Sequence, residues 1–275
     1  MKFTFLGTAA AEGFPAVFCD CPKCRRAAAA GGKNIRTRSQ SCMDEKLLID
    51  LPCDTYLHML QNGLDLLKVR NILITHIHED HFYPRELFYL NKGFSHPPAD
   101  WPGITVWGSE DVRSEIEVLR EHTHGMVRFQ EIHAFTPVQI DKYTVTPLPA
   151  FHGTKHPYIY MITNGEKTIL YAHDTDIFLP EVWEYLEREK PYFHMVSMDC
   201  TEGAMDDLEY NGHMCLGRNI RCRQKMTEIG VVDADTKVIL NHFSHNGKDS
   251  DYDSFLPYAR MHGFITSYDG MNIQI

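Results

Sequence analysis

One stretch constrains the fold of this chain more than any other: a short apolar run that ends in metal-binding side chains. Residues 72–74, Ile-Leu-Ile, predict a buried strand. His76, His78, Asp80 and His81 follow within six residues. In an extended chain residues two apart share a face, so the first two histidines point the same way, and Asp80 and His81 can aim at a neighbouring point. The end of one strand could therefore supply ligands to two adjacent metal positions. Imidazole and carboxylate ligands suit Zn²⁺, Mn²⁺ or Fe²⁺.

Residues 75–81, Thr-His-Ile-His-Glu-Asp-His, resemble the signature of the metallo-β-lactamase fold superfamily, whose members are mostly metal-dependent hydrolases. The resemblance implies an α/β fold, a metallo-β-lactamase-like αββα sandwich of two facing mixed sheets with helices outside. Glu79 is the variable position of the signature and is expected to face away. Because no repeat, low-complexity tract or linker separates the two halves, we expect residues 1–275 to form a single hydrolase domain.

The resemblance also implies three further ligands, each placed after a later strand. His152 fits the third histidine of the first metal, and His156 is a competitor in a looser loop, expected either near the substrate or exposed. Asp174 fits a carboxylate that bridges both metals, with Asp176 as the alternative, and His242 completes the second metal. The expected dinuclear site therefore comprises His76, His78, Asp80, His81, His152, Asp174 and His242.

Three early cysteines form a second candidate metal site. Cys19, Cys21 and Cys24 are spaced so that they can converge on one ion, and a structural zinc site needs a fourth ligand from elsewhere. The chain resembles the phosphoribosyl 1,2-cyclic phosphate phosphodiesterases of the carbon–phosphorus lyase pathway. That group combines such a cysteine motif, the histidine signature and a late His-x-x-His whose second histidine caps the cysteines. The resemblance implies His245 as the fourth ligand of a structural zinc.

This resemblance implies a phosphodiesterase that hydrolyses a small cyclic or short phosphodiester by a metal-bridged hydroxide. It implies two divalent metals in the active site, zinc or manganese with iron as a third option, besides the structural zinc. Asp80 is expected to ligate a metal and orient the nucleophile, and His213 to act as general acid or phosphate hydrogen-bond donor. The alternative for His213 is a place on the surface of a nearby helix that runs towards Met226.

The composition limits the kinds of partner that this protein can bind. The formal net charge is −10, and residues 82–135 hold five basic against eight acidic side chains, which argues against a broad electrostatic grip on nucleic acid. No apolar segment approaches the length of a membrane span, so we expect no membrane partner. Eight cysteines without an export signal indicate a reducing compartment, and we expect a cytoplasmic protein. The oligomeric state stays open, a homodimer included.

Other functions remain open alongside the phosphodiesterase. A transfer-RNA 3′ endonuclease of the ribonuclease Z type shares the ligand order, but the chain shows no basic, glycine-rich arm for transfer RNA. Acyl hydrolysis of the glyoxalase or lactamase kind is a third option. Residues 7–15 and 19–24 also resemble the pyrroloquinoline quinone biosynthesis protein B family, a non-hydrolytic binding protein whose members commonly lack a full set of dinuclear ligands.

Local patterns predict further elements and two side-chain environments. Strands are expected over residues 143–147, 158–163 and 167–172, and helices over 84–92, 109–124 and 180–190. Arg218, Arg221 and Arg223 are expected on a solvated face. The five cysteines without ligand spacing are expected to be buried thiols, namely Cys42, Cys53, Cys200, Cys215 and Cys222.

Overall fold

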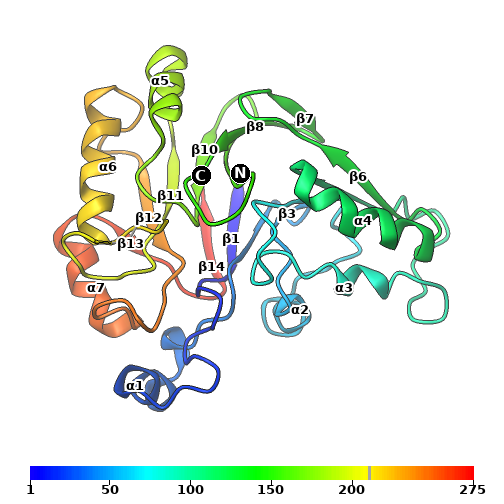
Figure 1. Ribbon diagram of the computed structural model, residues 1–275, viewed down its shortest axis with the longest axis horizontal. Coiled ribbons are helices and arrows are strands. Elements are labelled where there is room, and N and C mark those ends of the chain that lie inside the picture. The colour runs from blue at the N-terminus through cyan, green and yellow to red at the C-terminus, as the bar shows by residue number, and fades with distance from the viewer. Residues whose placement is uncertain (210–211) are drawn as a thin grey trace.

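The computed structural model describes residues 1–209 and 212–275. Within this part of the chain, two mixed sheets of seven strands each form the centre of the molecule (Figure 1). The first sheet contains, in spatial order, β14 (Met271–Gln274), β1 (Lys2–Gly7), β2 (Gln40–Met43), β3 (Leu47–Ile49), β4 (Asn71–Leu73), β5 (Ile104–Gly108) and β6 (Val127–Glu131).

The second sheet runs in the spatial order β13 (Ile265–Thr266), β12 (Lys237–Asn241), β11 (Met195–Asp199), β10 (Thr168–Ala172), β9 (Tyr158–Thr163), β8 (Tyr143–Pro149) and β7 (Val138–Ile140). Strands β10 to β13 are parallel, and β7 to β10 pair antiparallel. In the first sheet, β3 to β6 are parallel and the strands from β14 to β3 are antiparallel. Both sheets are therefore mixed, as predicted.

Helices cover the outer faces. Figure 1 shows α2 (Thr55–Asn62), α3 (Arg85–Phe88) and α4 (Glu110–His122) on the side of the first sheet. It shows α5 (Pro180–Glu189), α6 (Leu216–Glu228) and α7 (Tyr252–Met261) on the side of the second sheet. The layers are thus helix, sheet, sheet, helix, which confirms the predicted αββα sandwich. Among the described residues, no helix is both long and apolar enough to cross a lipid bilayer.

Three apolar layers hold the sandwich together. The central layer lies between the sheets and includes Phe3, Phe5, Tyr160, Ile162 and Ile169, all fully buried. Two outer layers fill the space between each sheet and its helices. Removing one large apolar side chain of this kind from water contributes about 1.5–3 kcal/mol to stability. Strands β3, β10 and β11 are buried at consecutive positions, because both faces of each sheet are covered.

The helix expected over residues 84–92 is shorter than predicted. Only Arg85–Phe88 is α-helical, because Leu90 N and Asn91 N bond to the carbonyls of Leu87 and Phe88, three residues back. This tighter pattern is typical of 3₁₀ turns, which rarely extend far. The other helices agree with the sequence within the usual uncertainty of helix ends, and Gly63 ends α2 in the left-handed conformation with φ 68°.

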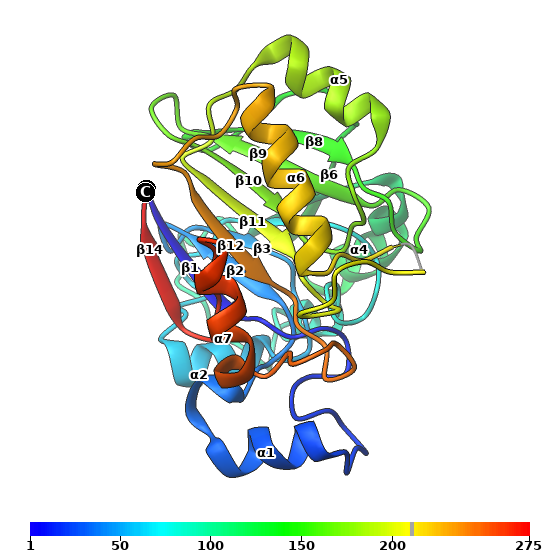
Figure 2. The same cartoon turned by 90° about the vertical axis from the view of Figure 1, so that its left-hand side faces the viewer.

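An N-terminal excursion stands apart from the sandwich. Figures 1 and 2 both show α1 (Pro22–Ala30) below the sheets, at the end of a loop that leaves β1. A short 3₁₀ helix, η1 (Gly32–Asn34), follows before the chain returns to β2. This helix buries Cys24 and Ala27 in a small apolar cluster, and a metal bound at the cysteine site described below would attach it further.

Candidate metal centre

The predicted ligands meet at the carboxyl ends of the parallel strands. His76 follows β4, Asp174 follows β10 and His242 follows β12, and β10 to β12 lie side by side in parallel register. Because the carboxyl ends of parallel strands share one edge of a sheet, loops far apart in sequence converge there. The two sheets bring their edges together, so the β4 loop of one sheet faces the β10 and β12 loops of the other.

The first donor group consists of three histidines. His76 Nε2 and His152 Nε2 each lie 3.0 Å from His78 Nδ1. Nitrogens bound to one tetrahedral zinc at its usual bond length lie about 3.3 Å apart, so the observed spacing is close to a coordination edge. His76 is buried and His78 exposed, so the group opens to solvent on the His78 side. His152 joins this group, and His156 does not.

The second donor group contains two histidines and two carboxylates, Asp80, His81, Asp174 and His242, all buried. The Nε2 atoms of His81 and His242 are 3.2 Å apart. Asp80 Oδ2 lies 3.4 Å from His81 Nε2, and Asp174 Oδ2 lies 3.1 Å from His242 Nε2. The four donor atoms lie within 4.8 Å of one another, which fits a single divalent ion.

Asp174 lies between the two groups. Its Oδ1 is 3.8 Å from His152 Nε2, while its Oδ2 contacts His81 and His242. Oδ2 is buried between the Nε2 atoms of His81 and His242. If these nitrogens gave up their protons to bind a metal, the cation would compensate the buried carboxylate in their place. The donor set therefore fits two divalent ions that share Asp174, and the ligand role of each residue stays a prediction.

Four of the candidate imidazoles also contact protein groups through their second ring nitrogen. The ring nitrogen that faces away from the donors is 2.7 Å from Asp50 Oδ2 in His81 and 2.9 Å from Thr201 Oγ1 in His242. The Nδ1 atom of His76 is 3.0 Å from Thr75 Oγ1, and the Nδ1 atom of His152 is 3.1 Å from the carbonyl of Gly212. Such outer contacts fix the tautomer and the ring orientation of metal-binding histidines.

Charge in the second donor group is balanced internally. Burial opposes ionisation of Asp174, but His242 and His81 hold its pKa well below the ordinary value. Burial likewise opposes a proton on His242, yet Asp174 raises the pKa of that ring to about 10. In the first group, burial lowers the pKa values of His76 and His152, which leaves them neutral and ready to bind a metal. A divalent ion in the second group would take over the balancing role of the protons.

Three residues of the centre have left-handed backbones. Asp50, Asp174 and His242 have φ angles of 66°, 50° and 63°. Non-glycine residues seldom adopt this conformation, which costs on the order of 1–3 kcal/mol when the surroundings impose it. Each of them lies one or two residues after the end of a strand, so the left-handed conformation redirects the chain at that point.

His213 reaches the edge of the centre. Its Nδ1 lies 3.4 Å from Asp174 Oδ1 and 3.0 Å from Asp199 Oδ2. It precedes α6, which begins at Leu216, and it is partly buried, so the alternative of a helix surface is wrong. Asp174, Asp199, His213 and His242 together also satisfy the spacing of a metal site. Its part in the chemistry stays a prediction.

Sequence reasoning missed three groups that shape this centre. Asp50, Asp199 and Thr201 are buried and contact the rings of His81, His213 and His242. A usable signal was present for the first two, because a carboxylate at the end of an apolar strand is unusual unless it has a partner. Asp50 follows β3 and Asp199 ends β11.

Other predicted side chains take places outside the centre. His156 Nδ1 lies 3.2 Å from Asp111, at the start of α4. Asp176 accepts a hydrogen bond of 2.6 Å from Arg218, which explains it without a bridging role. Arg218 is therefore buried rather than solvated, because Asp176 compensates its charge. Cys53 is exposed, contrary to prediction, since it lies in the turn before α2.

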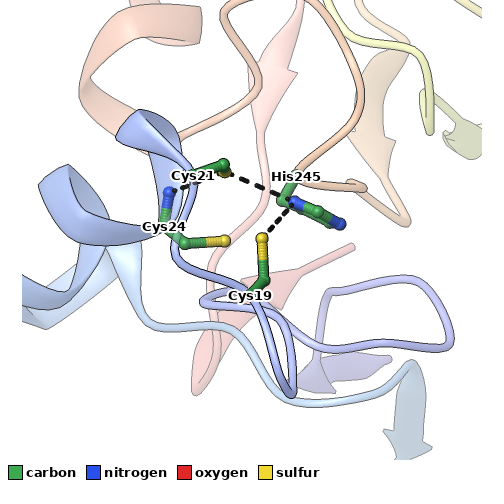
Figure 3. Close-up of side chains that lie close together, drawn as sticks. All are labelled: Cys19, Cys21, Cys24 and His245. Carbon is green, nitrogen blue, oxygen red and sulfur yellow. Dashed lines mark hydrogen bonds between the residues drawn. The ribbon is translucent and has the colours of Figure 1, made fainter.

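The cysteine motif meets His245 (Figure 3). The Sγ atoms of Cys19 and Cys21 lie 3.5 and 3.6 Å from His245 Nδ1, and the four donor atoms lie within 4.8 Å of one another. Sulfur and nitrogen bound to one tetrahedral zinc lie about 3.6 Å apart, so the arrangement fits structural zinc. The His245 contact lowers the pKa of Cys21 to about 6, while burial raises that of Cys24 to about 12. The site would fasten the α1 excursion to the loop that carries His242.

Fold and site together define a metal-dependent hydrolase of the metallo-β-lactamase fold. Residues 51–243 match the family described as the beta-lactamase superfamily domain, and the chain belongs to this family. A search of curated protein sequences finds no match to this chain.

Solved structures show the same fold along the whole chain. Zn²⁺-bound PqqB from Methylobacterium extorquens is 18% identical with a TM-score of 0.74, and all of both chains is covered. A diphosphatase of the PhnP family is 18% identical with a TM-score of 0.73, covering 99% of this chain and 97% of the other. The short form of human tRNase Z is 16% identical with a TM-score of 0.66, covering 100% and 99%.

Proposed function

We propose that this protein is a dinuclear metal-dependent phosphodiesterase that acts on a small cyclic or short phosphodiester. The observation that carries the proposal is the position of Asp174, with one carboxylate oxygen directed to each donor group. Two bound divalent ions supply Lewis-acid activation of water and of the phosphoryl oxygens. A pair of cations suits a phosphodiester, because its charge is distributed over two non-bridging oxygens.

The remaining steps belong to the side chains. Asp80, held beside His81 and His242, would orient the attacking water by accepting a hydrogen bond from it. Asp199 fixes Nδ1 of His213, so the transferable proton would be carried on Nε2 and passed to the leaving oxygen. Burial opposes a proton on His213, but Asp199 raises its pKa above the ordinary value, which favours the acid form at neutral pH.

The surroundings of the centre support a small substrate with an apolar portion. Ile77, Phe151 and Ile177 are 41%, 43% and 38% exposed and lie next to His76, His152 and Asp176 in sequence. The Phe151 carbonyl accepts a hydrogen bond from Asp176 N, which places the last two segments side by side. This apolar rim offers contact to the alcohol parts of the substrate. The net charge of −10 supports the same conclusion, because a nucleic acid backbone needs a basic face.

The test measures phosphodiester turnover and metal content together. The protein, purified with Mn²⁺ or Zn²⁺, is assayed with bis(p-nitrophenyl) phosphate and with five-membered cyclic phosphates. Asp80→Ala should abolish turnover, whereas Glu79→Gln, a change at the exposed neighbour, should leave it unaltered. About three metals per chain are expected. Undiminished turnover in Asp80→Ala refutes the assigned chemistry, and about one metal per chain favours a binding protein.

A transfer-RNA endonuclease is separated from this proposal by a direct assay. A precursor transfer RNA is incubated with the protein, and both retardation on a gel and cleavage at the 3′ side are measured. We expect neither, because the net charge is −10 and residues 82–135 are more acidic than basic. If the protein cleaves this RNA and the cleavage depends on Asp80, the substrate is an RNA and the proposal of a small phosphodiester is wrong.

A further inference from the structure

A cavity unconnected with the predicted ligands opens on the outer side of the first sheet. Its volume is about 750 Å³, within the range of roughly 300–1,000 Å³ that ligand pockets occupy. Ile72 of β4 and Ile104 of β5 line it on the side of the sheet, and residues of α2, α3 and the loop before β5 line the rest. Several of its lining residues, among them Leu51, Ile72 and Leu87, belong to the apolar layer between this sheet and its helices.

The walls are apolar and include large side chains that remain exposed. Tyr56, Leu67, Tyr89 and Phe94 line the cavity and are 58%, 45%, 54% and 61% exposed. Single exposed apolar residues are ordinary, but four around one cavity form a contiguous patch, and such patches mark binding sites. Trp101 is fixed at the wall by a hydrogen bond of 2.9 Å from its Nε1 to the Leu67 carbonyl.

One charged side chain of the lining has no counter-ion. Among the described residues, the Glu86 carboxylate makes no hydrogen bond and no ion pair. Burial alone raises the pKa of Glu86, so no neighbouring cation compensates its charge. Glu86 is partly buried, and a partly desolvated carboxylate without a counter-ion is a suitable partner for a positively charged ligand group.

We propose that this cavity binds a small amphiphile, an apolar chain or ring with an ammonium head that pairs with Glu86. The apolar walls would take the body of the ligand. The cavity is separate from the metal centre, but one backbone hydrogen bond connects a residue of its wall with a residue of the centre. Leu51 lines the cavity, and its backbone N donates to the His81 carbonyl at 2.7 Å.

The experiment uses the full, metal-loaded chain and isothermal titration calorimetry. The probes are n-octylammonium, n-octanol and octanoate, which share the apolar chain and differ in the charge of the head. Octylammonium should bind at least about tenfold more tightly than octanol, and octanoate more weakly than both. In Glu86→Gln the preference for ammonium over octanol should fall to about one, while binding of octanol is retained.

Two further variants complete the design. Leu90→Trp fills the cavity and should abolish binding of all three probes, with metal content and circular dichroism checked against wild type. Glu115→Gln, an exposed glutamate of α4 outside this cavity, should change nothing. Absence of octylammonium binding, or a preference that survives in Glu86→Gln, overturns the proposal. Sedimentation showing a dimer that Phe94→Ser dissociates also overturns it, because a second copy then covers the cavity.

Discussion

The Nδ1 atom of His81 donates a hydrogen bond of 2.7 Å to Asp50 Oδ2, and both side chains are completely buried. Asp50 also accepts hydrogen bonds from the backbone N and the hydroxyl of Thr75, at the start of the histidine signature. One carboxylate thus joins the end of β3 to the β4 loop and sets the direction in which His81 presents Nε2 to the second donor group. The centre depends on this residue although it is no candidate ligand.

Replacing Asp50 tests this relationship. In Asp50→Asn, the amide is a weaker acceptor, so we expect the affinity for the second metal to fall about 10- to 100-fold. The three-histidine group should retain its ion, because Asp50 contacts none of its rings. Calorimetric metal titration of the metal-free chain resolves the two steps. Asp141→Asn is the matched control, since Asp141 also has a left-handed backbone, with φ 54°, but is exposed. An unchanged second affinity would contradict the prediction.

His213 and His156 can be separated by kinetics. His213→Gln should lower kcat for a phosphodiester about 10²- to 10⁴-fold, the usual contribution of a positioned acid, and should leave metal content unchanged. His156→Gln should alter kcat less than about threefold, because His156 is held by Asp111 outside both donor groups. A substrate with a p-nitrophenol leaving group needs little protonation, so the His213→Gln defect should shrink with it. A loss of metal in that variant would instead make His213 a ligand.

Thiol reactivity tests the cysteine site and its pH dependence. The contact with His245 lowers the pKa of Cys21 to about 6, so its thiolate fraction rises as pH increases through that value. In the metal-free chain, iodoacetamide should modify Cys21 with a half-maximal rate near pH 6. Burial raises the pKa of Cys24 to about 12, and that thiol should stay unmodified. Peptide mass spectrometry identifies the modified residue.

Zinc supplies the control for this experiment. One equivalent of Zn²⁺ should suppress the modification of Cys21, because the metal occupies the thiolate. In His245→Ala, the pH midpoint should move towards the ordinary thiol value and zinc protection should weaken. A midpoint near 9 in the wild-type chain would count against the contact between Cys21 and His245.

The layer between the sheets should dominate stability. Ile162 is fully buried there, so Ile162→Ala should lower the free energy of unfolding by about 2–5 kcal/mol. Val118→Ala, at a side chain of α4 that is 62% exposed, should change it by about 0.5 kcal/mol or less. Urea unfolding of the metal-loaded proteins gives both values, and a similar loss in the two variants would show that the sheets are not packed as described.

The sequence by itself indicated the first candidate ligands from local order, and its resemblance to the metallo-β-lactamase superfamily implied the sandwich. An apolar strand followed by His76, His78, Asp80 and His81 specifies its chemistry within a few residues. The later candidate ligands His152, Asp174 and His242 each follow a strand, and the resemblance to the superfamily implied them. The cysteine spacing was readable from the sequence, whereas the resemblance implied His245 as the partner of these cysteines.

Only the tertiary structure decided which groups support those ligands. Asp50, Asp199 and Thr201 contact histidines 31, 14 and 41 residues away, and no local pattern encodes such pairings. The same holds for the burial of Arg218 against Asp176 and for the cavity beside Glu86. Burial and partnership arise when two sheets and their helices pack in three dimensions. A sequence can therefore name a metal ligand from its neighbours, but not the distant carboxylate that orients it.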